Sequence, residues 1–435
     1  SFSLDVPKDG IVTAPTDIIG TISDDGDIDY YTVEVAPVAG GEFKEILRVD
    51  DPDAVTDGVL GKFDPSLLQN DSYRVRLSVY DTGGNGTFAE EVVDVAGELK
   101  LGNFRLSFTD LSVPVTGIPI TLTRTYDTLT SSTTDDFGYG WRMEFRDTDL
   151  RTSLGKPTEE DELLGRKPAY KDDTRVYITL PGGKREGFTF KPSIDPISGF
   201  LRGAAAGTNA DTNIYRPAFE ADDGVTSTLT VKDERIIRNN GTSEFFGISG
   251  SRYNPADSLF GGTYILTTKE GIEYEIDGVS GDLLSVTDTN GNTLTYTDEA
   301  VTSSTGQKIT FERDAEGRIT SVKDPEGELI KYEYDDNGDL VSVTDREENV
   351  TRMEYNPERE HYLDKIIDPL GRTGARNEYG EDGRLKKVFD ANGNAVELDY
   401  NPENSIQTVK DVFGNPTTYE YDERGNILTE IDAVG

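Results

Sequence analysis

Hydrophobic and polar residues alternate along most of this chain, in short runs that end at Asp and Gly. In the run Ile330–Tyr334 the even-numbered positions are apolar or aromatic, and Lys331 and Glu333 lie between them. A period of two predicts a half-buried β-strand. Asp-Gly and Asn-Gly pairs follow such runs and supply the positive φ that tight hairpin turns need, as at Asn337-Gly338, Asp382-Gly383 and Asn392-Gly393. The pattern therefore predicts consecutive antiparallel hairpins.

The hairpins repeat at a near-constant spacing in the last third of the chain. Each unit reads as a hydrophobic residue, one spacer, Asp, two spacers and usually Gly, with Glu348 in one unit where Gly is expected. Successive aspartates lie 21 to 23 residues apart, at Asp324, Asp345, Asp368, Asp390, Asp411 and Asp432. Such a period predicts a repeat architecture, in which each unit depends on its neighbours to bury its apolar face.

Two details complicate the simple repeat. Leu340 and Val343 lie three residues apart, so they face opposite sides of a strand unless a β-bulge intervenes. Asp288 precedes Asp324 by 36 residues, which predicts an additional strand or hairpin around Thr293–Tyr296. Both positions are tests of the hairpin interpretation.

The chain divides into three parts. Residues 1–98 alternate between Gly- and Asp-rich turns and predict an antiparallel β-sandwich, with a weak similarity to immunoglobulin-like and fibronectin-like modules. Residues 99–262 hold short strands and one short polar helical patch, Pro157–Leu164. Residues 263–435 hold the repeats. We expect an all-β protein.

The Tyr-Asp pairs and the V-x-D-x-x-G spacing resemble the YD repeats of bacterial RHS proteins, which also occur in insecticidal toxin-complex components and in teneurins. A second block looks like the lead-in region that precedes such repeats: Phe108–Pro114, Gly117–Ile120, Arg124–Asp127 and Asp136–Trp141. Together the two blocks cover residues 100–435. The resemblance implies a spiral sheet that closes into a hollow shell around a polypeptide, often a C-terminal toxin.

The formal charge is −40, from 83 acidic and 43 basic residues. Such acidity repels nucleic acid and anionic membrane surfaces, so neither is an expected partner. There is no cysteine, which excludes disulfides, zinc-thiolate sites and cysteine nucleophiles. No apolar stretch is as long as a membrane span. The chain begins without Met and ends inside a repeat, so we expect a piece of a longer secreted or surface protein.

Signals for catalysis are sparse, and no enzyme activity is expected. His361 is the only histidine and fits a surface turn better than a catalytic triad. Asp81-Thr82-Gly83 has the letters of an aspartic protease motif but occurs once, in a turn. Asp324-Pro325 and Asp368-Pro369 resemble part of the self-cleaving segment of RHS proteins, yet both lie in phase with ordinary turns.

Calcium is the one ligand that the sequence suggests, and no other cofactor is expected. Carboxylates gather in one loop of the predicted sandwich, at Asp24, Asp25, Asp27 and Asp29. Ca²⁺ prefers six to eight oxygen ligands, although this spacing is not that of an EF-hand and Asp also favours turns for backbone reasons.

The expected function is a non-enzymatic scaffold whose partners are the rest of the same polypeptide and an enclosed toxin. The alternatives are an extracellular adhesin that binds glycan or a neighbouring cell, and a fibre formed by self-association at an unpaired strand edge. The stacked tyrosines could grip a guest chain, but cross-strand packing is the more ordinary role of such a face.

Overall fold

The computed structural model describes residues 2–4, 11–23, 27–97, 99–144, 146, 148–157, 159–196, 198, 213–239, 241–422 and 425–435. Nearly all regular structure in these ranges is β-strand, which confirms the predicted all-β class. The α-helix α1 (Glu159–Leu163) is short and exposed and lies in the predicted helical patch. Four 3₁₀ turns complete the regular elements: η1 (Pro65–Leu67), η2 (Thr128–Thr130), η3 (Ser258–Phe260) and η4 (Pro402–Asn404).

The N-terminal part is the predicted β-sandwich. One sheet pairs β1 (Phe2–Leu4), β3 (Thr16–Ile22) and β6 (Val55–Phe63). The other has the order β2 (Ile11–Val12), β8 (Gly86–Val95), β7 (Asp71–Asp81), β4 (Ile28–Pro37) and β5 (Lys44–Asp50). The alternation in β7 places Tyr73, Val75 and Leu77 in the core between the sheets, because every second side chain of a strand points to the same face.

Short sheets connect the sandwich to the repeats. The strands β9 (Arg105–Val113), β10 (Ile120–Asp127) and β13 (Trp141–Met143) form one antiparallel sheet, beside the two-stranded ribbon of β11 (Thr134–Asp135) and β12 (Gly138–Tyr139). A second sheet contains β14 (Arg151–Thr152), β15 (Arg175–Thr179), β16 (Arg185–Phe190) and β19 (Phe219–Ala221). A third contains β17 (Ser193–Ile194), β18 (Ile214–Arg216), β21 (Ile236–Arg238) and β22 (Phe245–Gly247).

The repeats form one continuous sheet of 18 strands, each antiparallel to the next along the chain. It begins at β20 (Thr228–Val231), before residue 263. It continues through β23 (Thr263–Thr267), β24 (Glu273–Asp277), β25 (Leu283–Thr287), β26 (Thr293–Tyr296), β27 (Ala300–Ser303), β28 (Lys308–Arg313), β29 (Ile319–Lys323), β30 (Leu329–Tyr334), β31 (Leu340–Thr344), β32 (Val350–Tyr355), β33 (Leu363–Ile367), β34 (Thr373–Tyr379), β35 (Leu385–Phe389), β36 (Ala395–Asn401), β37 (Ile406–Lys410), β38 (Pro416–Tyr421) and β39 (Ile427–Ile431). The additional hairpin predicted between Asp288 and Asp324 is present as β26 and β27.

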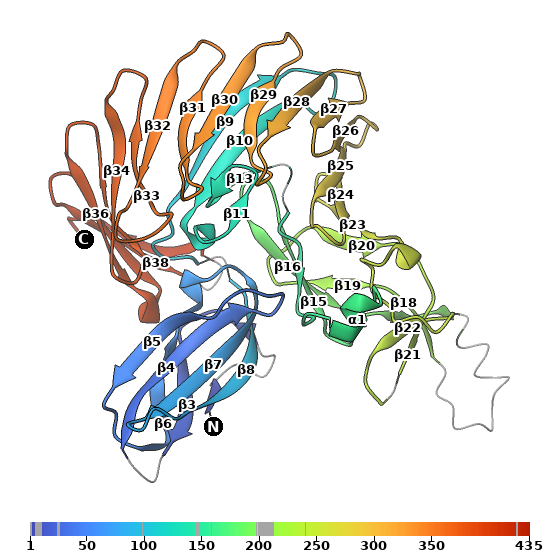
Figure 1. Cartoon of the computed structure of the whole chain (residues 1–435), viewed down its shortest axis with the longest axis vertical. Coiled ribbons are helices and arrows are strands. Elements are labelled where there is room, and N and C mark those ends of the chain that lie inside the picture. Colours follow the sequence, from blue (N-terminus) through green and yellow to red (C-terminus); the bar gives the residue numbers. More distant parts are fainter. Residues whose placement is uncertain are drawn as a thin grey trace.

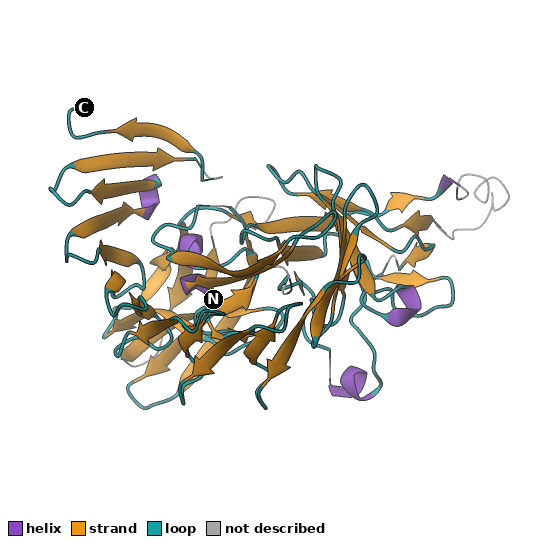
Figure 2. Ribbon diagram, turned by 90° about the horizontal axis from the view of Figure 1, so that it is seen from above, coloured by secondary structure: helices purple, strands orange, loops and turns teal. Residues whose placement is uncertain are grey.

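The long sheet is curved into an arc. Figure 1 shows the strands from β20 to β38 following this arc, with β9, β10 and β13 inside it and the sandwich below. Figure 2 shows the same strands from above, stacked side by side towards the C-terminus. A single apolar core joins the inner face of the sheet to the lead-in strands, and the sandwich has a core of its own.

A β-bulge recurs at the start of alternate strands. Glu333 pairs with Ser342, but Tyr334 pairs with Leu340, so one additional residue is accommodated between them. The bulge turns Leu340 and Val343 to the same side, and both are buried. This resolves the spacing that a regular strand could not explain. The same register shift occurs where β25, β29, β33, β35 and β39 meet the preceding strand.

The repeated Asp builds the turn at the end of each hairpin. The Asp335 carboxylate accepts hydrogen bonds from the amides of Asn337 (3.0 Å) and Asp339 (2.9 Å). Gly338 closes the turn at φ 86°, and Asn337 does not share its positive φ. The turns thus place one residue, not two, in the left-handed region. In the exceptional unit Glu348 takes the glycine position at φ 61°.

Candidate functional site

The repeats share their apolar core with residues 101–144 and Arg146, here called the seam segment. It crosses the strands on the inner face of the arc (Figure 1). At four bulges the amide of the bulge residue donates a hydrogen bond to this segment: Leu283 to the Arg146 carbonyl (2.8 Å), Ile319 to the Asp136 carbonyl (2.7 Å), Leu363 to the Tyr126 hydroxyl (2.9 Å) and Leu385 to the Gly102 carbonyl (2.9 Å). In a fifth unit the Tyr139 amide donates to the Gly338 carbonyl at 3.4 Å. The C-terminal end of the seam segment therefore contacts the first of these repeats, and its N-terminal end contacts the last.

The repeated tyrosine reinforces each bulge. At four bulges its hydroxyl donates to the carbonyl of the bulge residue 15 or 16 positions earlier, so that adjacent repeats are tied together. The pairs are Tyr334 with Ile319 (2.6 Å), Tyr355 with Leu340 (2.9 Å), Tyr379 with Leu363 (2.8 Å) and Tyr400 with Leu385 (2.6 Å). These tyrosines pack the sheet against itself and its own lead-in region.

Trp141 lies at the centre of the seam. Its ring is fully buried, and its indole N–H donates to the Tyr355 hydroxyl at 2.9 Å. Tyr126 packs against it with 5.4 Å between ring centroids, and the Arg124 guanidinium lies 4.8 Å from its ring. Tyr126 hydrogen-bonds to the repeats, and Trp141 hydrogen-bonds to Tyr355, which is itself part of the repeats. The cluster therefore joins the seam segment to the repeats through both apolar contacts and hydrogen bonds.

A buried ion pair lies next to this cluster. Arg124 donates to Asp110 at 2.8 Å, and both side chains are at least nine-tenths buried. Tyr332 of the repeats donates to the same carboxylate at 2.9 Å. Burial raises the pKa of Tyr332 well above its ordinary value, so the phenol keeps the proton that it donates. The carboxylate thus binds one donor from the seam segment and one from the repeats.

Gly138 permits a close approach between the backbone of the seam segment and that of the repeats. A Cβ atom at this position would lie 2.3 Å from the Gly338 carbonyl oxygen, and the backbone φ is 82°. Any other residue would therefore push the seam segment away from the repeats as well as adopt an unfavourable backbone conformation.

His361 lies in a turn, as expected, but not at the surface. Its φ is 63°, and its side chain is only 15% exposed. The imidazole stacks on Tyr139 at 3.7 Å between ring centroids, and its Nδ1 lies 2.9 Å from Asp339. Its backbone carbonyl accepts the Tyr126 hydroxyl at 2.7 Å. The surface location was wrong because the seam segment, distant in sequence, covers this turn.

The sandwich is fixed to the repeats through Arg384. This side chain is 3% exposed and donates to Asp64 at 2.5 Å and to the Ser66 hydroxyl at 3.0 Å. It also reaches the carbonyl of Leu101. Lys62 adds an exposed ion pair with Glu403 at 2.9 Å. The sandwich therefore contacts units near the C-terminal end of the arc.

A second attachment joins the sandwich to β14–β16. Asp71 is 1% exposed and accepts from Arg151 at 3.0 Å, while Arg185 donates to the Asn70 carbonyl. Burial raises the pKa of Asp71, and the positive charges of Arg185 and Arg151 oppose this effect. Tyr177 adds a hydrogen bond to Asp94 at 3.2 Å. The sandwich is thus held on both sides of the seam.

The regular bulge pattern is interrupted just beyond the seam and returns between β38 and β39. Between β36 and β37 the register has no shift, and Asn401 pairs with Ile406. Gln407 then takes the position on the tyrosine face, and the Tyr421 hydroxyl donates to its side chain at 2.9 Å. The inner face of β36–β39 is only partly covered, since Tyr400 and Tyr419 are half-buried.

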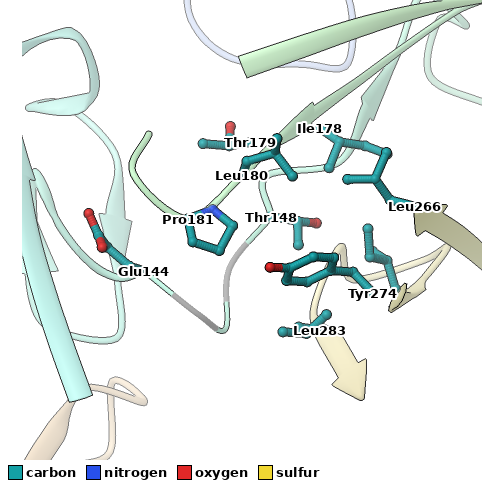
Figure 3. A pocket seen from close by; sticks show the side chains of 10 residues that line it. Glu144, Thr148, Ile178, Thr179, Leu180, Pro181, Leu266, Tyr274 and Leu283 are labelled. Carbon is teal, nitrogen blue, oxygen red and sulfur yellow. The ribbon is translucent and has the colours of Figure 1, made fainter. Parts of the chain in front are cut away.

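One contact region between the sheet and its neighbours is tightly packed. Figure 3 shows Leu266, Tyr274 and Leu283 of the repeats facing the segment Ile178–Pro181. The cavity between them has a volume of about 10 Å³, which is enough for one water molecule at most. It is part of the packed core and offers no ligand site.

The predicted calcium site lies only partly within the described residues. Asp24 and Asp25 are outside them. Asp27 and Asp29 are exposed, and their backbone carbonyls accept from the amides of Thr82 and Asp51. Over the described part of the chain no group of three or more acidic or histidine side chains has a metal-binding arrangement. Calcium at this loop stays a prediction.

The other chemical candidates lie in turns. Asp81 accepts from the Asn85 amide and side chain at 2.8 and 2.7 Å, and these bonds lower its pKa. Asp324 and Asp368 close ordinary repeat turns through Gly327 and Gly371. Sequence reasoning did not find the seam contacts of Trp141, whose only signal was its place in the lead-in motif.

Comparison with known families identifies the repeats. The family model "RHS Repeat" matches residues 300–329. The chain carries RHS repeats. A model described as "Domain of unknown function (DUF6531)" matches residues 98–153, the part that contains the seam segment. The predicted resemblance to RHS proteins is therefore confirmed. No curated protein matches the chain.

Solved structures with some similarity include TcdB2-TccC3 complexes. The chain is 12% identical to TcdB2-TccC3 without its hypervariable C-terminal region, with a TM-score of 0.28 and 96% of this chain covered. The corresponding values for the Tc holotoxin pore of Photorhabdus luminescens are 12%, 0.25 and 83%. The chain spans about 22% of the length of each of these chains. In the described residues no helix is long and apolar enough to cross a membrane.

Proposed function

We propose that this chain is a non-enzymatic scaffold within a larger secreted or cell-surface RHS protein, whose β-shell encloses a polypeptide such as a C-terminal toxin. The observation that supports this most strongly is the seam. One segment contacts five successive repeats through hydrogen bonds that backbone amides donate, four of them at β-bulges. Such an arrangement fixes the curvature of a sheet and fills part of its inner face.

The sandwich and the seam segment would close one end of the shell. The seam segment excludes water and any guest chain from the inner face between β25 and β33, because its side chains form a continuous core with these strands. Space for a guest would begin where this cover ends, at β36–β39. The sandwich, held by Arg384 and Asp71, would keep the closed end rigid.

Cryo-electron microscopy of the full-length gene product tests this function. We expect a sheet that continues from β39, surrounds a closed space and contains density for an enclosed chain. Limited proteolysis of the same sample should leave the enclosed chain intact until the shell is unfolded. A full-length product whose sheet stays open, or whose additional domains all lie outside the sheet, would refute encapsulation.

A fibre-forming or adhesive surface protein is the second candidate. The last strand of the sheet, β39, has a neighbour on one side only among the described strands, and Ile427, Leu428 and Ile431 on it are 53%, 68% and 43% exposed. Such edges are templates for pairing with another chain. Light scattering coupled to size-exclusion chromatography separates the candidates: concentration-dependent oligomers that Leu428→Lys abolishes would favour the fibre.

A further inference from the structure

A cavity of about 380 Å³ lies where the sandwich, the seam segment and the repeats meet. Its wall includes Lys44 of β5, the turn around η2, and the loop between β32 and β33. Small-molecule sites often form at domain junctions and have volumes of roughly 300 to 1,000 Å³. The position and size of this cavity are therefore those of a ligand site.

Two cations line this cavity without a carboxylate partner. Within the described residues Lys44 forms no ion pair or hydrogen bond through its ammonium group, and Arg359 donates only to the carbonyls of Gly380 and Glu381. The Arg359 guanidinium also lies 5.2 Å from the Tyr362 ring. Arg384, by contrast, binds a carboxylate. In a chain with 83 acidic and 43 basic residues, two adjacent unneutralised cations require an explanation.

The electrostatics at Lys44 show what is missing. Lys44 is partly exposed to solvent, and its pKa is lowered by partial desolvation of the ammonium group and, to a smaller extent, by the positive charge of Arg359. No carboxylate acts in the opposite direction. Glu42, Glu45, Glu381 and Asp382 also line the cavity, but no carboxylate is among the groups that shift the pKa of Lys44. An anion bound between Lys44 and Arg359 would offset the repulsion between the two positive charges.

The repeat that supplies Arg359 is longer than its neighbours. Asp345 and Asp368 are 23 residues apart, and the loop between β32 and β33 runs from Asn356 to Tyr362. The Asn356 side chain accepts from the Arg359 amide at 3.1 Å, which fixes the base of the side chain. The additional loop residues thus place the Arg359 guanidinium at the cavity.

Hydroxyl groups add to the polar wall of the cavity. Thr128, Ser131 and Thr133 line the cavity on the seam side. We propose that this cavity binds a small hydroxylated organic anion, whose carboxylate or phosphate group lies between Lys44 and Arg359 while its hydroxyls meet the threonine and serine side chains. The ligand would bridge the sandwich and the repeats.

Isothermal titration calorimetry on the whole chain tests the proposal, with inorganic phosphate, citrate and glucuronate as probes. We expect at least one probe to bind at one site. Lys44→Gln should weaken that binding roughly tenfold to a hundredfold, the loss expected for one hydrogen bond between charged groups. Lys308→Gln is the matched control, because Lys308 is an exposed lysine that also begins a strand, outside the cavity.

Each outcome has a defined meaning. Binding of phosphate alone assigns a phosphorylated ligand, and binding of citrate or glucuronate alone assigns a carboxylate. The proposal is overturned if no probe binds, or if both lysine variants weaken binding equally, which would indicate non-specific charge attraction. Failure of the scaffold function would not affect this result, and unchanged Trp141 fluorescence in Lys44→Gln would confirm that the seam is intact.

Discussion

Removal of one hydroxyl group at the centre of the seam should separate the contribution of the seam from that of the repeats. Tyr355→Phe removes an oxygen that accepts from the Trp141 indole at 2.9 Å and donates to the Leu340 carbonyl at 2.9 Å. Tyr400→Phe removes the equivalent oxygen of a later repeat, which bonds to the Leu385 carbonyl at 2.6 Å. The two variants differ chiefly by the bond to the seam segment.

The magnitudes follow from the number of buried groups that lose a partner. In Tyr355→Phe two such groups remain, and each costs about 1 to 3 kcal/mol, so the free energy of unfolding should fall by about 2 to 6 kcal/mol. In Tyr400→Phe one group remains at a half-buried site, so the loss should be about 1 kcal/mol. The difference between these two losses measures how much the hydrogen bond between Trp141 and Tyr355 stabilises the protein.

Trp141 is the only tryptophan, so its fluorescence reports on the seam directly. Urea unfolding monitored by this emission gives the free energies for the wild type and both variants. Tyr355→Phe should also shift the native emission, whereas Tyr400→Phe should not. Equal losses in the two variants, or a loss below about 0.5 kcal/mol for Tyr355→Phe, would refute a stabilising seam contact.

Four further results are expected. Gly138→Ala should expose Trp141 to solvent and shift its emission to longer wavelength, whereas Gly291→Ala, at the same φ of 82° in open space, should not. Arg384→Met should lower the free energy of unfolding by about 3 kcal/mol, measured by urea titration, because it leaves a carboxylate and a carbonyl unpaired. Glu348→Gly should raise the melting temperature, since it relieves a left-handed backbone that costs about 1 kcal/mol. Hydrogen bonds from Asn394 lower the pKa of Asp390. The ionised Asp390 side chain therefore stabilises the fold fully above pH about 3.9, and this stabilisation is lost as the pH falls through the lowered pKa. Plots of unfolding free energy against pH for the wild type and Asp390→Asn should converge in that range.

Much of the fold could be predicted because its elements are local. The alternation in Ile330–Tyr334 and the Asp of each turn depend on residues within a few positions, and both appear as expected. The spacing of Leu340 and Val343 left open whether a bulge lies between them, and the structure contains one there. The sequence did not indicate what the bulge does, since the partner of each bulge amide lies about 140 to 280 residues away.

The candidate site was harder to predict for the same reason. His361 looks like a surface residue until Tyr139, more than 200 positions earlier, covers it. Asp110 and Arg124 carry no local sign that Tyr332 will complete their ion pair. Contacts of this kind depend on the path of the seam segment across the sheet, which no periodicity within either part determines.

Amide hydrogen exchange with residue resolution tests the central claim most directly. If the seam segment fixes the repeats, the amides of Leu283, Ile319, Leu363 and Leu385 should exchange as slowly as buried strand amides, although each bonds outside the sheet. All four should lose protection together in Gly138→Ala. Rapid exchange of these amides in the wild-type chain, at the rate of exposed turn residues, would contradict the account.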